Sequence, residues 1–141
     1  MDRIDVFTFV PNTVGFVEND AFVARIAGNI QSTQQLFELF YRLLALPGYF
    51  GFNWNALFDC LRDFHWVNEK NIVIIHDDLP ELDALEMRIY LEVLSDAIVD
   101  WKPGEEHSLK VVFNDKDRTR IKAGMLTHIG WDDSANPAFT N

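Results

Sequence analysis

The sequence lacks several features that would assign it at once to a broad class of proteins. Its single cysteine, Cys60, has no second cysteine with which to pair, so a disulfide within the chain is excluded and a cytoplasmic location is expected. No apolar run approaches the roughly 18 residues that a membrane-spanning helix needs. The first residues include Asp2 and Asp5 and no long apolar stretch, unlike a secretory signal. We therefore expect no membrane association.

Motifs for cofactors, metals and nucleophilic catalysis are also missing. The sequence has no glycine-rich phosphate loop, no nucleophile elbow and no paired-histidine motif. His76, Asp77 and Asp78 follow an apolar run, where open α/β sheets often bind ligands, but an aspartate before a turn is ordinary capping chemistry. Cys60 falls on the apolar stripe of a predicted helix, which favours a buried thiol over a nucleophile. We expect no enzyme activity, no cofactor and no metal.

Positive charge is scarce, and the formal net charge is −10. The excess lies in residues 1–110, because the four acidic and four basic residues of 111–141 cancel. Such a charge repels nucleic acid and anionic lipid and speeds the encounter with cationic partners, although acidic surfaces also simply keep proteins in solution. The charge favours a basic protein as partner over direct binding of nucleic acid.

The residues that are present predict one α/β domain. Apolar runs predict strands at residues 4–10, 22–27, 72–75 and 109–113. Capping residues Ser32 and Asn53 precede two helices that end near residues 47 and 64, and a long helix is predicted over residues 84–101. This alternation predicts a small three-stranded parallel sheet with packed helices, to which residues 4–10 could add an N-terminal strand. Residues after about 114 show no clear pattern.

Aromatic side chains are concentrated in residues 46–61, at Tyr49, Phe50, Phe52, Trp54 and Phe58. One helix face cannot bury all of them, so some should project outward beside Asp59. Exposed tyrosine and tryptophan beside a carboxylate are typical of protein-binding hot spots. The alternative is that the rings pack beneath the loop, which we expect first for Phe50 and Phe58.

Acidic residues recur every four positions along the predicted long helix, at Glu92, Asp96 and Asp100. This spacing places them on one face, which we expect to be exposed. Like charges at this spacing disfavour an isolated helix by roughly 0.2–0.5 kcal/mol per pair, which points to a cationic partner. An ordinary solvated face is the alternative.

The aromatic segment resembles the signature of the barstar family. The resemblance rests on sixteen consecutive positions, Leu46-Pro47-x-Tyr49-Phe50-Gly51-x-Asn53-x-x-Ala56-Leu57-Phe58-Asp59-Cys60-Leu61. With weaker agreement in the order of strands and helices, it covers about residues 22–113. We therefore predict a barstar-like domain over residues 21–113, an N-terminal extension over residues 1–20 and a C-terminal extension over residues 114–141.

The resemblance implies the inhibition of a ribonuclease by a helix and its preceding loop, whose carboxylates replace substrate phosphates. The family's principal acid matches Asp59, its tyrosine matches Tyr49, and a later acid matches Asp96. Three family positions differ here: a glutamate is replaced by Phe52, an acid by Asn55 and a leucine by Trp54. These changes imply a more apolar contact surface and a different cognate toxin.

The sequence thus predicts a stoichiometric inhibitor of a basic nuclease. The predicted partner-binding residues are Tyr49, Phe52, Trp54, Asn55, Asp59, Glu92 and Asp96. The alternative is an interaction module of the same fold that has no toxin partner.

Overall fold

The computed structural model describes residues 3–125 of the chain. In chain order the elements are η1 (Arg3–Val6), β1 (Thr8–Val10), η2 (Thr13–Gly15), β2 (Ala21–Ile26), α1 (Thr33–Leu43), α2 (Trp54–Leu61), β3 (Asn71–His76), α3 (Ala84–Asp100), β4 (Ser108–Asn114), η3 (Asp115–Asp117) and α4 (Arg118–Gly124). The predicted alternation of strands and helices is therefore confirmed. The elements η3 and α4 were not predicted, because residues after about 114 show no clear pattern.

Within residues 3–125, four strands form one parallel sheet in the spatial order β1-β4-β3-β2. The predicted three-stranded sheet consists of β2, β3 and β4. The added N-terminal strand β1 lies along the outer edge of β4, where Thr8 is opposite Val112 and Val10 is opposite Asn114. The predicted small parallel sheet and its extra strand are confirmed.

The N-terminal strand is shorter than the predicted range of residues 4–10. Its first half forms the 3-10 helix η1, because the N–H of Phe7 donates to the carbonyl of Ile4 at 3.0 Å and closes a turn. This turn buries both side chains, which are 5% and 2% exposed. Burial of two apolar side chains in the core outweighs the β-propensity of the run.

Each of the three main helices begins directly after a polar residue whose side chain caps it. Ser32, Asn53 and Asp83 are the N-caps of α1, α2 and α3, and each side chain accepts a backbone N–H from the residue three positions later, at 3.1, 2.8 and 2.8 Å. These bonds satisfy N–H groups that have no partner inside the helix. The cap at Asn53 fixes the point at which the aromatic loop becomes helix.

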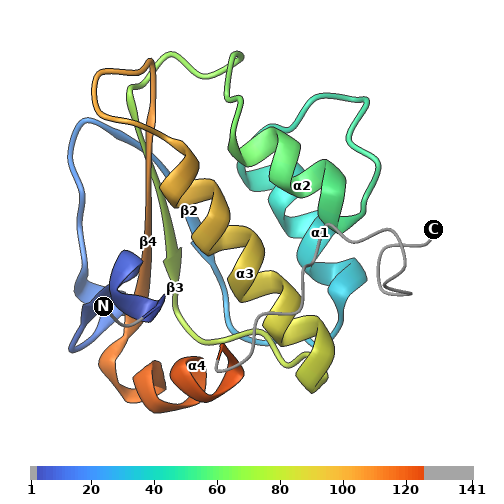
Figure 1. Cartoon of the computed structure of the whole chain (residues 1–141), viewed down its shortest axis with the longest axis vertical. Coiled ribbons are helices and arrows are strands. Elements are labelled where there is room, and N and C mark those ends of the chain that lie inside the picture. The colour runs from blue at the N-terminus through green and yellow to red at the C-terminus, as the bar shows by residue number, and fades with distance from the viewer. Residues whose placement is uncertain (1–2, 126–141) are drawn as a thin grey trace.

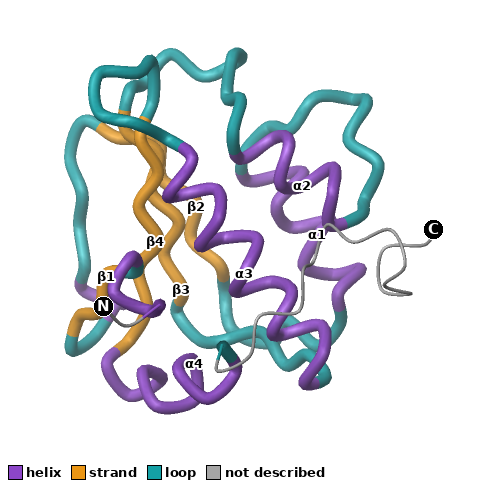
Figure 2. The backbone as a smooth tube through the Cα atoms, viewed as in Figure 1, coloured by secondary structure: helices purple, strands orange, loops and turns teal. Residues whose placement is uncertain are grey.

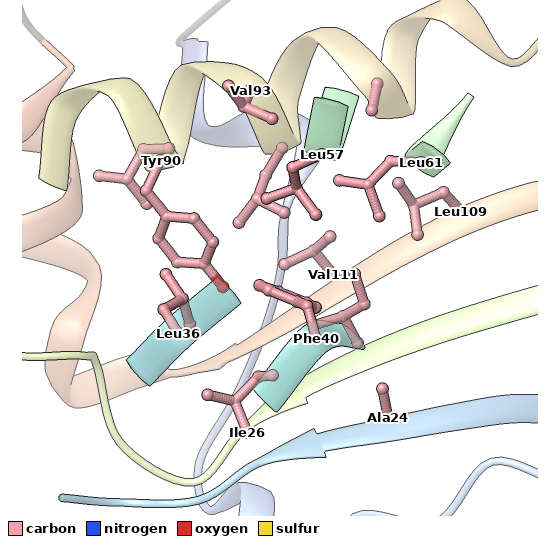
Figure 3. Packing of buried hydrophobic residues seen from close by; sticks show 14 of the residues in the cluster. Ala24, Ile26, Leu36, Phe40, Leu57, Leu61, Tyr90, Val93, Leu109 and Val111 are labelled. Carbon is pink, nitrogen blue, oxygen red and sulfur yellow. The ribbon is translucent and has the colours of Figure 1, made fainter. Parts of the chain in front are cut away.

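The three main helices cover one face of the sheet (Figures 1 and 2). Between the two layers lies the main core, to which β2, β3 and β4 contribute alternate residues. Figure 3 shows side chains of α1, α2 and α3 pointing toward side chains of β2 and β4. The labelled residues are Leu36 and Phe40 of α1, Leu57 and Leu61 of α2, Tyr90 and Val93 of α3, Ala24 and Ile26 of β2, and Leu109 and Val111 of β4.

The opposite face of the sheet is covered in part by the connection between β1 and β2, residues 11–20, while Val23 on the same face stays 38% exposed. A small apolar cluster of Val73, Ile75 and Val112 packs there against Phe16 and neighbouring residues. The guanidinium of Arg25 on β2 donates to the carbonyl of Phe16 at 3.0 Å. The N-terminal segment is therefore part of the folded unit: β1 pairs with β4, and the connection after it packs on the face of the sheet opposite the helices.

The side chain of Asn114, which is 5% exposed, joins this connection to the ends of two strands. Its Oδ1 accepts the N–H of Thr13 at 2.8 Å, and its Nδ2 donates to the carbonyl of Asp77 at 2.9 Å. We expect Asn114→Ala to lower the free energy of unfolding by about 2 kcal/mol, because it leaves buried backbone groups without partners. Urea denaturation measures this loss.

A matched control for this prediction is Asn12→Ala, because Asn12 is exposed and its Oδ1 accepts a bond only within the same turn, from the N–H of Val14. We expect that change to cost less than Asn114→Ala. Equal losses for the two variants would contradict the role given to Asn114.

Candidate functional site

Helix α2 presents one polar face to solvent and buries the other. The face opposite the core carries Asn55 and Asp59, which are four residues apart and both exposed. The predicted apolar stripe is buried, with Leu57, Cys60, Leu61 and Phe64 all at most 3% exposed. The prediction that Cys60 lies on a buried apolar stripe is therefore confirmed, and Asp59 points away from the protein interior.

The exposed ring of Tyr49 lies beside Asp59 at a shallow pocket. Tyr49 is 69% exposed and belongs to the loop between α1 and α2. The pocket has a volume of about 150 Å³ and is lined by Tyr49, Phe50, Ala56, Asp59, Cys60 and Asp63. Its apolar walls and acidic rim suit a cationic side chain that carries apolar carbon atoms.

Two groups at this pocket, the Cys60 thiol and the Tyr49 phenol, have raised pKa values. Burial raises the pKa of the Cys60 thiol to about 11, with further contributions from the charges of Asp59 and Asp63. Partial loss of hydration raises the pKa of the Tyr49 phenol, and Asp63 acts in the same direction. At neutral pH both groups are therefore protonated, so Cys60 is not a nucleophile and the Tyr49 hydroxyl can donate a hydrogen bond.

Asp63 is a carboxylate of this site that the sequence analysis did not single out. It is exposed, and its Oδ2 lies 2.8 Å from Nδ1 of His65. Its position four residues after Asp59 is the signal that could have identified it. The pocket therefore has two acidic residues at its rim.

Phe52 lies at the edge of the site and is half-buried. Its ring centroid is 4.8 Å from that of Phe50 and 5.3 Å from that of Tyr41, whose side chain is partly exposed on α1. Its backbone has φ of +54°, a conformation that costs about 1 kcal/mol or more for a residue with a side chain. The surrounding rings hold Phe52 in this conformation.

Trp54 is not an exposed contact, so its prediction as a partner-binding side chain is wrong. It is 1% exposed. Its ring packs edge-on against Phe37 at 4.8 Å, and its indole Nε1–H donates to Oε2 of Glu86 at 2.9 Å. Trp54 lies three residues before Leu57, so the helix turns both side chains toward the core.

Glu92 is also not an exposed contact, and the predicted acidic stripe on α3 is wrong at this position. Glu92 is 0% exposed. Helix α3 is contacted by α2, β4, α4 and η1, so it has little free surface in this region. The residues of η1 were predicted as strand and α4 was not predicted, so two of the elements that pack on α3 were missing from the prediction of an exposed face.

The other two members of that stripe lie nearer the surface. Asp96 is half-buried. Asp100 is exposed and forms an ion pair with Nε of Arg62, which follows the last residue of α2. The guanidinium of Arg62 also lies over the ring of Phe58, 5.0 Å from its centroid. Asp100 is therefore engaged within the chain, beside the end of α2.

The polar residues at the carboxyl end of β3 have partners within the chain. His76 is 0% exposed, with Nε2 2.6 Å from the hydroxyl of Tyr90. Asp77 accepts a hydrogen bond from Arg25 at 2.8 Å, and Asp78 forms a 2.9 Å ion pair with Lys116. In the part of the chain described, no group of three or more His, Cys, Asp or Glu side chains could hold a metal ion. No helix among those residues combines the length and apolarity needed to cross a bilayer.

Comparison with known proteins identifies the family. Residues 21–122 match the family model described as Barstar (barnase inhibitor), and no curated protein matches the chain. The match begins at the first residue of β2, extends into α4, and includes the site around Tyr49 and Asp59. Because it covers well over half of the sequence, the chain belongs to the barstar family, whose members are inhibitors rather than enzymes.

Proposed function

We propose that this protein is a stoichiometric inhibitor of a basic nuclease, with a ribonuclease as the first candidate, and that it has no enzyme activity of its own. The observation that carries the proposal is the exposed carboxylate of Asp59 on the outer face of α2, beside the exposed ring of Tyr49. Membership of a family of barnase inhibitors supports the same function.

In this proposal Asp59 acts as a substitute for a substrate phosphate. A nuclease holds phosphate with arginine and lysine side chains, and these donate short, charge-assisted hydrogen bonds to a carboxylate as readily as to a phosphate. Asp59 and Asp63 both line the pocket. Arg62, the nearest base in sequence, pairs with Asp100 and leaves the acidic character of the pocket in place.

The remaining contacts would surround Asp59 with less polar surface. Tyr49 offers a large exposed ring and a hydroxyl donor, Phe52 offers a half-buried ring, and Asn55 offers an amide one helical turn before Asp59. Asp96 on α3 would contribute to steering from the side of the site. Trp54 and Glu92 have no place in this surface, because both are buried.

Association with the nuclease should depend strongly on salt. The net charge of −10 attracts a basic partner over about one Debye length, which is roughly 30 Å at 0.01 M salt and shortens as salt is added. We expect the association rate constant to fall about tenfold or more between 0.01 and 0.5 M salt, with a smaller change in the dissociation rate. Stopped-flow mixing measures both rates. An association rate that does not change with salt would contradict steering.

Identification of the partner is the direct test of the proposed function. The tagged full chain is purified from the native host under mild conditions, and bound proteins are identified by mass spectrometry. Recovery of a basic nuclease at one-to-one stoichiometry supports inhibition. Recovery of a stable acidic or neutral partner instead favours the interaction module and contradicts the proposal.

A further inference from the structure

Residues 44–61, here called the binding segment, contain the loop and the helix that carry Tyr49, Asn55 and Asp59. The segment begins where α1 ends and finishes with the last residue of α2. Indole N–H groups hold the segment at three points: two indoles from outside donate to its beginning and to the end of α2, and an indole of the segment itself, at the start of α2, donates to α3. The three indoles belong to Trp66, Trp101 and Trp54.

Trp66 holds the beginning of the segment. Its Nε1–H donates to the carbonyl of Leu44 at 2.9 Å, and Leu44 is the C-cap of α1. Carbonyl groups in the last turn of a helix lack a partner within the helix. The indole supplies that partner and fixes the direction in which the loop leaves α1.

Trp54 holds the start of α2. Its indole donates to Oε2 of Glu86 at 2.9 Å, and the same oxygen accepts the hydroxyl of Thr33 at 3.1 Å. Thr33 and Trp54 are the first residues of α1 and α2, and Glu86 lies in the first turn of α3. One carboxylate oxygen thus joins the beginnings of three helices, where their dipoles favour negative charge.

Trp101 holds the end of α2. It is the C-cap of α3, and its Nε1–H donates to the carbonyl of Leu61 at 2.9 Å. Leu61 is the last residue of α2, so this carbonyl is again one that the helix leaves without an internal partner. The outer face of α2, with Asp59, is therefore held at both ends.

The loop between α1 and α2 contains backbone conformations that the surrounding structure must stabilise. Ala45 and Phe52 have φ of +52° and +54°, the left-handed region that residues with side chains adopt only when their surroundings hold them there. Inside the loop, the N–H of Phe50 donates to the carbonyl of Pro47 at 2.9 Å. The three indole bonds fix the two ends of the loop and the far end of α2.

We propose that Trp54, Trp66 and Trp101 are positioning residues that hold the binding segment in the conformation its partner recognises. This inference rests on the proposed function. A partner binds with full affinity only to the fraction of molecules already in the competent conformation. Hydrogen bonds that keep nearly all molecules in the competent conformation therefore strengthen binding, although they do not contact the partner.

The test compares three single Trp→Phe variants with a control that loses a hydrogen bond elsewhere. Each Trp→Phe change keeps an aromatic ring and removes the indole N–H. The control is Tyr90→Phe, which keeps its ring and removes the buried 2.6 Å hydrogen bond to His76. Urea denaturation first establishes how much stability each variant loses.

The first measurement is amide hydrogen exchange of the whole chain, followed by mass spectrometry. We expect peptides within residues 44–61 to exchange about tenfold faster in the Trp→Phe variants than in Tyr90→Phe, as loss of roughly one hydrogen bond's free energy implies. Glu86→Leu should reproduce the effect of Trp54→Phe, and Glu86→Gln, which keeps an acceptor oxygen, should restore slow exchange. Equal exchange of this segment in the tryptophan variants and the control would overturn the inference.

The second measurement uses the nuclease recovered with the wild-type chain. We expect its complex with a Trp→Phe variant to dissociate several-fold to tenfold faster, and its complex with Tyr90→Phe to dissociate at the wild-type rate. Unchanged dissociation in the tryptophan variants would overturn their positioning role while leaving the inhibitor function intact. If no nuclease binds the wild-type chain, the proposed function fails, and hydrogen exchange alone decides whether the indoles hold the segment.

Discussion

Replacing Asp59 with alanine should weaken binding of the nuclease by about 2–5 kcal/mol, which is roughly 30-fold to several-thousand-fold in Kd. Asp59 is exposed at the pocket rim, so the change removes the proposed phosphate substitute without disturbing the core. The large effect arises because the partner's arginine and lysine side chains would then be buried without a carboxylate. Calorimetry or surface-based kinetics gives the change in Kd.

The matched control for this prediction is Asp115→Ala, which removes the same charge from the exposed surface of η3. This element precedes α4, away from α2 (Figure 1). We expect the control to alter the association rate slightly and the dissociation rate not at all. Equal affinity of the Asp59→Ala variant and the wild type would show that Asp59 is not the centre of the interface.

Acid should destabilise the protein through His76, the second large effect that we expect. A carbonyl can only accept, so Nδ1 of His76 carries the hydrogen that faces the carbonyl of Val112 at 3.2 Å, and Nε2 accepts the hydroxyl of Tyr90. Burial lowers the pKa of this neutral imidazole from 6.5 to about 3. The buried surroundings of His76 give its charged form no hydration and therefore disfavour it.

The sign of the effect follows from the two pKa values. Between pH 6.5 and 3 the unfolded chain binds a proton at His76 and the folded chain does not, so stability falls as the pH falls. The slope is about 1.4 kcal/mol per pH unit, so this residue should account for a loss of about 2–3 kcal/mol between pH 6 and pH 4. About one pH unit above 6.5, where neither state binds the proton, its contribution becomes complete and constant.

Urea denaturation at several pH values measures this loss. The reference is the His76→Gln variant, because the other titrating groups affect the wild type and the variant alike. We expect the free energy of unfolding of the variant to fall less steeply with acid. Nuclear magnetic resonance gives an independent check. A ring signal of His76 that titrates near pH 6.5 in the folded protein would contradict the role of burial.

Most of the fold could be predicted from the sequence because its signals are local. Polar caps at Ser32 and Asn53 mark helix starts, and the apolar runs at residues 72–75 and 109–113 are typical of strands buried on both faces. The N-terminal strand was longer in the prediction than in the structure, because the burial of Ile4 depends on α3. The pattern of apolar residues along a segment does not show which distant element a given side chain packs against.

The site could be predicted only in part, because exposure depends on more than one helix. The exposure of Asn55 and Asp59 could be predicted because they lie opposite a clear apolar stripe, and their contact with a partner stays a prediction. Trp54 lies on that same stripe, and its spacing of three residues from Leu57 indicates burial, whereas the concentration of aromatic residues in this segment favoured exposure. Glu92 lies in a helix with apolar residues on several faces, a pattern typical of buried helices.

The central claim is that a carboxylate on α2 occupies the site where the nuclease binds phosphate. The most direct test is a titration of the activity of the recovered nuclease with the full chain. We predict that activity falls to zero at one equivalent of wild-type protein and that Asp59→Ala requires a large excess. A saturated complex that still cleaves its substrate would contradict the claim, because the chain would then bind the enzyme without closing its active site.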